Sequence, residues 1–163
     1  VIAFGTEPKL STGSHVKTQR LAGYQDALNQ VDAALKDHVT YSYVESSVEG
    51  GRRAATELLA GGLRPSVFIA MSDILALGII EAVAEAELRV PEDISVVGFD
   101  DIPEARLVRP QLTTVSQPGY DKGRHAADTL MQLIAKEYTS RHIILPTELV
   151  IRDSTTTVAV SEL

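Results

Sequence analysis

Hydroxyl and carboxylate side chains stand directly after the apolar runs of this sequence, where they could bind a small molecule. Three such pairs are Glu45 and Ser46, Ser72 and Asp73, and Asp100 and Asp101. Arg20, on a helix predicted after the first run, could reach the same place. These groups suit an uncharged ligand that is rich in hydroxyls. A phosphate would call for a glycine-rich loop, and neither G-x-G-x-x-G nor G-x-x-x-x-G-K-[ST] occurs.

Each of these residues also has a purely structural interpretation. Asp73 stands where a helix begins, and capping that helix is the more common role for an aspartate there. Asp100 and Asp101 are common turn residues. Arg20 could form an ion pair at the surface. Both interpretations stay open on the residues alone.

The sequence carries few signatures of an enzyme. It has no G-x-S-x-G elbow, no H-E-x-x-H motif and no cysteine, and its four histidines show no ligand spacing. Asp100 and Asp101 could hold Mg²⁺, as in a phosphoryl-transfer or receiver-like domain, but no convincing lysine accompanies them. We therefore expect no catalysis, no cofactor and no resident metal.

Alternating strands and helices must position these groups. Strands are expected at 1–4, 39–44, 67–71 and 94–99, and helices at 14–31, with Ser14 as N-cap, 49–60 and 73–86. Strands that are apolar at nearly every position are buried on both faces, which predicts an α/β fold with a doubly wound, mostly parallel sheet. Polar residues in the run 39–44 favour the edge of that sheet.

The alternation ends after Pro103. A loop and a short strand follow up to Val115, and then an amphipathic helix is expected at 120–136 with Leu130, Met131 and Ile134 on one face. The segment 142–153 reads as two short strands broken at Pro146.

Length and charge limit the possible partners. The chain has 163 residues, which fits one domain or one lobe of a larger protein, and its net charge is −7. No cluster of lysine and arginine exceeds two residues, so this chain is a poor candidate for binding nucleic acid. No apolar run is long enough to span a bilayer and no secretory signal opens the sequence. We expect a cytoplasmic protein with no membrane partner.

Several separated strings resemble one family. ALGIIEAVAEAELRVPEDISVVGFDDIPEARLVRPQLTTVSQP is followed by GRHAADTLMQLI and LPTELVIRDS, and TQRLAGYQDAL lies upstream. Together they resemble the effector-binding module of the LacI/GalR bacterial transcription repressors, over about residues 1–154. The resemblance implies a type I periplasmic-binding-protein fold, in which a sugar or nucleobase binds between two lobes, and operator DNA is bound through a helix-turn-helix headpiece that precedes them.

The resemblance also implies a division of the chain. Residues 1–117 and 147–154 correspond to the C-terminal lobe, 118–146 to a crossover helix segment that belongs to the other lobe, and 155–163 to a tail. The other lobe and the headpiece would precede Val1. The apolar face of the helix at 120–136 should then be exposed here, and self-association or a swapped arrangement would cover it.

By the same resemblance, Arg20 and Asp100 match an arginine and an aspartate that bind the effector, and Gln117 matches a polar residue of the crossover. Ser72 stands where sugar-binding members often carry Asn, and Ser46 where an aromatic ring commonly stacks on the ligand. These two departures put a simple monosaccharide assignment in doubt.

A homodimer is the other expected assembly. In the family, the helix near 75–86 and the loop near 104–109 face the sister subunit. The residues expected at that interface are Leu75, Ile79, Ala82, Val83 and Arg106. The alternative function is that of a sugar-binding protein of a transport system, which shares the fold. The GFDD and LPTELVIRDS strings favour the repressor.

Overall fold

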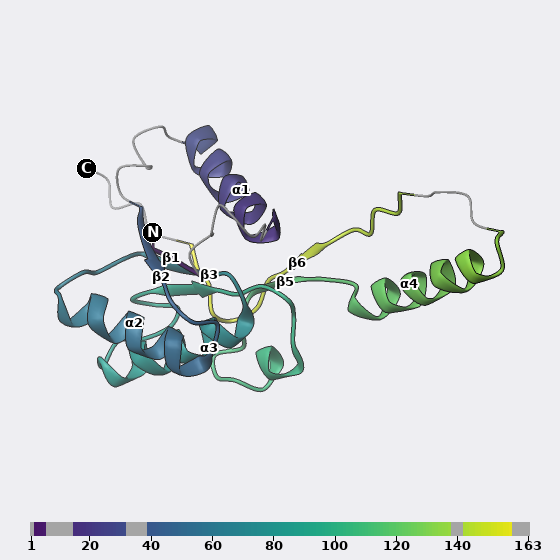
Figure 1. Cartoon of the computed structure of the whole chain (residues 1–163). Helices are drawn as coiled ribbons and strands as arrows, with labels where there is room; N and C mark the ends of the chain where they lie inside the picture. The colour runs from purple at the N-terminus through teal and green to yellow at the C-terminus, as the bar shows by residue number, and fades with distance from the viewer. Residues whose placement is uncertain (1, 6–14, 32–38, 138–141, 158–163) are drawn as a thin grey trace.

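The computed structural model describes residues 2–5, 15–31, 39–137 and 142–157 (Figure 1). Val1, the expected N-cap Ser14 and residues 158–163 of the tail lie outside these ranges. The elements follow the expected alternation of strand and helix up to β4, and the bounds differ from the sequence-based ones by a few residues at most.

A four-stranded sheet forms the centre of the lobe. Its strands lie in the order β2-β1-β3-β4, and each neighbouring pair is parallel. The strands are β1 (Ile2–Gly5), β2 (Thr40–Tyr43), β3 (Val67–Ala70) and β4 (Ser95–Val97). The parallel α/β class is confirmed, and so is the edge position of β2.

Helices cover both faces of this sheet. In Figure 1, α1 (His15–Val31) lies on one side, and α2 (Val48–Ala60) and α3 (Asp73–Glu85) lie together on the other. Glycines let α2 and α3 come close. A Cβ on Gly51 would stand 2.2 Å from the Leu75 carbonyl oxygen, and one on Gly78 would stand 1.9 Å from that of Val48.

The apolar face of α3 lies in the core of this chain. Leu75, Ile79, Ala82 and Val83 are each at most 1% exposed in the chain by itself. They pack in one cluster with side chains of the sheet such as Phe68. The 3.6-residue period identified a buried face correctly, but the partner of that face is this chain's own core.

After β4 the chain leaves the sheet. It passes through a 3₁₀ helix (Pro103–Arg106) and enters β5 (Thr114–Ser116), which pairs antiparallel with β6 (Glu148–Val150). The expected strand before Pro146 is wrong, because the described segment 142–147 contains no strand. The three residues of β5 already pair with β6, which leaves that segment no strand to extend.

Between β5 and β6, helix α4 (Gly119–Ile134) extends away from the sheet (Figure 1). None of its side chains is buried against the described part of the chain. Leu130, Met131, Leu133 and Ile134 are 50–67% exposed. The expected exposure of its apolar face is therefore confirmed.

Candidate functional site

The five residues expected to bind an effector lie near the carboxyl ends of the parallel strands, where ligands of open α/β sheets bind. Arg20 comes from α1, Ser46 follows β2, Ser72 follows β3, Asp100 follows β4 and Gln117 follows β5. Contacts between their side chains divide them into two groups. Arg20 and Gln117 both contact Asp100, and Ser46 contacts Ser72.

Arg20 is held by three contacts. Its Nη1 donates to the Met71 carbonyl oxygen at 2.8 Å, and its Nη2 lies 3.7 Å from Oδ1 of Asp100. The guanidinium carbon also lies 3.5 Å from the centre of the Phe99 ring, which is a cation–π contact. An ion pair of Arg20 with Asp26 or Glu45 was the structural alternative, and the pair that Arg20 forms is instead with Asp100, inside the candidate site.

Asp100 occupies a constrained position. Its φ is 118°, a conformation that non-glycine residues rarely adopt, and its N–H donates to the Val115 carbonyl oxygen at 2.9 Å. Nε2 of Gln117 donates to its Oδ1 at 2.5 Å. Gln117 in turn accepts a hydrogen bond from Nζ of Lys122. The Asp100 carboxylate therefore faces donors from two places, Arg20 on α1 and Gln117 just after β5.

Sequence reasoning missed Lys122, which joins this network, and Tyr24, which interacts electrostatically with it. Lys122 lies in the first turn of α4, and no motif indicated that it would reach Gln117. Tyr24 lies four residues after Arg20 on the same helix face, a spacing that could have indicated it. Burial raises the pKa of its phenol, with a smaller opposing effect from Arg20 and a supporting one from Asp100.

The hydroxyl pair lies at the start of α3. Oγ of Ser46 and Oγ of Ser72 are 3.3 Å apart. Ser72 is the N-cap of α3, since its Oγ accepts from the Leu75 N–H at 3.4 Å. The expectation that Asp73 caps this helix is therefore wrong by one position. Asp73 is fully buried, and its carboxylate bonds elsewhere.

Asp101 forms ion pairs with two arginines. Its carboxylate lies 2.5 Å from Nη2 of Arg152 and 3.1 Å from Nη2 of Arg106. Burial pushes the pKa of Asp101 upward, but the hydrogen bonds from these two arginines bring it below its usual value. Arg106, the fifth residue expected at a dimer interface, is thus paired inside the chain, although its side chain is 66% exposed.

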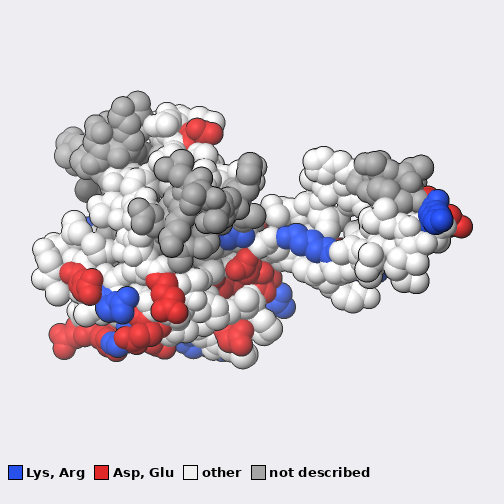
Figure 2. Space-filling model, viewed as in Figure 1, with Lys and Arg blue, Asp and Glu red and all other residues white. Residues whose placement is uncertain are grey.

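Within the described residues, no group of three or more His, Cys, Asp or Glu side chains could hold a metal ion. Across the same part of the chain, no helix is both long and apolar enough to cross a membrane. Acidic and basic side chains lie close together on the face shown in Figure 2. On α2 and α3, Arg52 pairs with Glu49 at 2.8 Å and with Glu85 at 3.5 Å.

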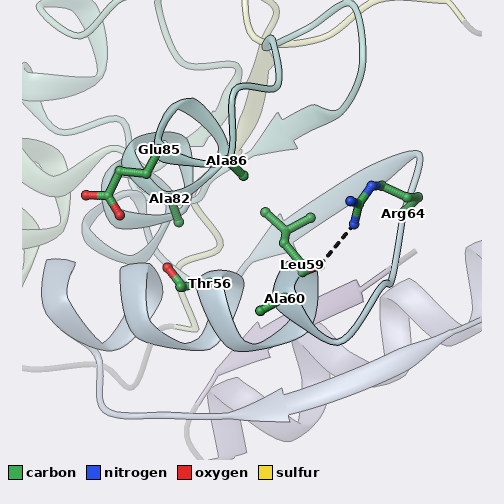
Figure 3. Close-up of a pocket in the computed structure, with 7 residues that line it drawn as sticks. All are labelled: Thr56, Leu59, Ala60, Arg64, Ala82, Glu85 and Ala86. Atoms are coloured by element: carbon green, nitrogen blue, oxygen red, sulfur yellow. Dashed lines mark hydrogen bonds between the residues drawn. The ribbon is translucent and has the colours of Figure 1, made fainter.

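A separate pocket of about 360 Å³ lies between the C-terminal halves of α2 and α3 (Figure 3). Its lining residues are Thr56, Leu59, Ala60, Arg64, Ala82, Glu85 and Ala86. Nη1 of Arg64 donates to the Leu59 carbonyl oxygen at 3.0 Å. The pocket shares no residue with the candidate site at the start of α3.

Comparison with known proteins gives a consistent family. A model of the periplasmic binding protein-like domain matches residues 2–155. The chain is 36% identical over 141 residues to a ribose operon repressor of Haemophilus influenzae, covering 85% of this chain and 42% of that protein. It is 41% identical over 106 residues to a lactose operon repressor of Rhizobium radiobacter, covering 65% of this chain and 94% of that sequence. The chain spans about two fifths of the Haemophilus relative.

Solved structures agree with this result. A LacI family transcriptional regulator from Enterococcus faecium with bound ribose superimposes with a TM-score of 0.85 at 28% identity, over 97% of this chain and 57% of that one. A dimeric Lac repressor with an 11-residue C-terminal deletion gives a TM-score of 0.82 at 31% identity, over 94% and 54% of the two chains.

Proposed function

Because the chain belongs to the periplasmic binding protein-like domains of the LacI family of transcription regulators, we propose that it is the effector-sensing lobe of such a regulator. The observation that carries the proposal is the Arg20–Asp100–Gln117 network at the carboxyl ends of the sheet. The relatives are named as repressors or regulators of transcription.

The effector is a small polyol. Arg20 supplies donors, Asp100 supplies an acceptor, and the hydroxyls of Ser46 and Ser72 can do either. Each vicinal hydroxyl of a sugar both donates and accepts, so a guanidinium beside a carboxylate suits it. A pentose is the first candidate, because ribose is bound in two of the similar solved structures.

The chain's own contacts hold the network together. Arg20 and Asp100 are 3.7 Å apart, which is longer than a good charge-assisted hydrogen bond. A polyol oxygen that donates to Asp100 and accepts from Arg20 would replace this loose pair with two shorter contacts. Side chains fixed by Met71, Phe99 and Gln117 lose little further freedom on binding.

In the proposed regulator, residues 1–117 and 147–154 form this lobe, 118–146 belong to the other lobe and 155–163 form a tail. Operator DNA is bound by a helix-turn-helix headpiece elsewhere in the protein, as a homodimer in the cytoplasm. Since β5 and β6 connect this lobe to α4, an effector that bridges the lobes shifts their relative populations and so changes DNA binding.

Calorimetry on the full-length protein with D-ribose and a panel of small sugars tests the proposal. Arg20→Ala and Asp100→Asn should each weaken binding by about 1–3 kcal/mol, which is roughly 5- to 150-fold. Arg53→Ala, at an exposed arginine of α2, is the matched control and should leave affinity unchanged. Unchanged affinity in both site variants would reject this assignment.

A further inference from the structure

Asp73 is a fully buried carboxylate that bonds to two other segments of the chain. Its Oδ2 accepts from the Ile102 N–H at 2.9 Å, and its Oδ1 accepts from the Thr114 hydroxyl at 2.5 Å. Its own N–H donates to the Phe99 carbonyl oxygen at 2.8 Å. An acidic residue in the first turn of a helix is commonly stabilised by that helix's own amides. Here neither side-chain partner belongs to α3.

The first segment is the loop that carries Asp100. Phe99 and Ile102, which flank Asp100 and Asp101, are both bonded to Asp73. The two residues between them have φ of 118° and 56°, and a left-handed backbone persists only where its surroundings enforce it. Asp73 therefore forms hydrogen bonds to the loop on both sides of Asp100 and Asp101. These contacts on both sides of Asp100 restrict the backbone from which its carboxylate projects.

The second segment is the crossover strand. Thr114 is itself fully buried in β5, three residues before Gln117. Gln117 then donates to Asp100. Gly98 leaves the necessary space, because a Cβ there would stand 2.2 Å from Oδ1 of Asp73.

We propose that Asp73 is a positioning residue of the effector site, whose buried carboxylate ties the loop that carries Asp100 to the strand that leads to Gln117. The positioning role of Asp73 rests on the proposed function, because that function identifies Asp100 and Gln117 as effector-binding residues. The tie itself is a property of the fold. Burial raises the pKa of Asp73, against the hydrogen bonds from Thr114 and Ile102, as expected for a carboxylate with no arginine or lysine among its hydrogen-bond partners in the described chain.

Hydrogen–deuterium exchange of the full-length protein tests the tie without any ligand. Thr114→Val removes the hydroxyl at nearly constant volume, whereas Thr114→Ser keeps the hydroxyl and removes a methyl group. We expect exchange in the segment 99–102 to accelerate at least tenfold in Thr114→Val and to stay within twofold of wild type in Thr114→Ser. Exchange in β3 serves as the internal reference for an intact fold and should not change.

Equal acceleration in both variants, or none in either, would overturn the proposal. Equal acceleration would show that Thr114 acts through packing. If Thr114→Val does not fold, the wild-type protein still decides, because its Thr114 hydroxyl proton should be visible by NMR as a slowly exchanging signal. A rapidly exchanging hydroxyl there would overturn the tie.

Calorimetry with D-ribose then asks whether the tie serves the site. Thr114→Val should bind D-ribose at least fivefold more weakly than wild type, and Thr114→Ser should bind within twofold of it. Equal affinity in wild type and Thr114→Val, with exchange accelerated, would remove the positioning role. If wild type does not bind D-ribose, the choice of a pentose fails, and the exchange measurement decides on Asp73 by itself.

Discussion

Arg152, two residues after β6, pairs with Asp101 in the loop after β4, with Nη2 of the arginine 2.5 Å from Oδ1 of the aspartate. The two side chains are only 9% and 7% exposed. Nη1 of the same arginine donates to the Leu112 carbonyl oxygen at 2.8 Å. The Arg152 guanidinium therefore connects the loop after β4 to the segment that leads into β5.

Arg152→Ala should destabilise the protein by about 3–5 kcal/mol, because it leaves a buried carboxylate without its main partner. Arg106→Ala is the matched control, since Arg106 reaches the same carboxylate from an exposed position and should cost less than about 1 kcal/mol. Urea unfolding of the three proteins measures both values. Equal costs would contradict the distinction between the two arginines.

Gly78→Ala should lower stability, although alanine is normally the better residue inside a helix. The added Cβ would meet the Val48 carbonyl oxygen and force α2 and α3 apart, at a cost of about 1–3 kcal/mol. Gly123→Ala in α4, where nothing lies within 4 Å of the added atom, should instead stabilise its helix by up to about 1 kcal/mol. Thermal unfolding that moved both variants in one direction would contradict the close approach of α2 and α3.

The ion pair of Asp93 and Arg89 should appear in a titration. The hydrogen bonds from the Arg89 side chain and backbone lower the pKa of Asp93 from 3.8 to about 2. A depressed carboxyl pKa contributes stability above the unfolded value, and this contribution disappears as the pH falls from about 4 toward 2. NMR titration of the carboxyl carbon measures the pKa directly. Arg89→Gln should return it toward 3.8, and a midpoint near 3.8 in wild type would contradict the pairing.

The exposed apolar face of α4 should make the 163-residue chain self-associate when it is produced alone. Leu130, Met131, Leu133 and Ile134 offer a contiguous surface that water solvates poorly. Met131→Glu should shift sedimentation at micromolar concentration toward the monomer. Leu63→Glu, at a partly exposed leucine after α2, should not. A wild-type chain that sediments as a monomer with α4 ordered would contradict the prediction.

Much of the fold followed from local patterns. The apolar runs predicted parallel strands because only burial on both faces tolerates them, and Thr40 and Ser42 marked the edge strand. The rule for carboxyl ends of strands then selected Ser46, Ser72 and Asp100. These features could be predicted because each depends on residues that are close in sequence or on a general rule of topology.

Other features depend on distant partners. Periodicity shows that Leu75 and Ile79 share a face, but it cannot show whether that face meets the sheet or a second subunit. Asp73 looked like a cap because its true partners, Ile102 and Thr114, lie 29 and 41 positions away. Lys122 is only five positions from Gln117, but it reaches the site through Gln117, whose own partner Asp100 lies 17 positions away.

The backbone of Asp100 has a consequence for any attempt to redesign ligand preference. Asparagine and aspartate tolerate positive φ far better than other side chains that accept hydrogen bonds, so substitution of Asp100 changes loop shape together with chemistry. Ser46 carries no such constraint, since it is exposed and has no positive φ. Substitution of Ser46 can therefore change ligand preference without altering the loop, whereas the positive φ at position 100 restricts the residues that can replace Asp100.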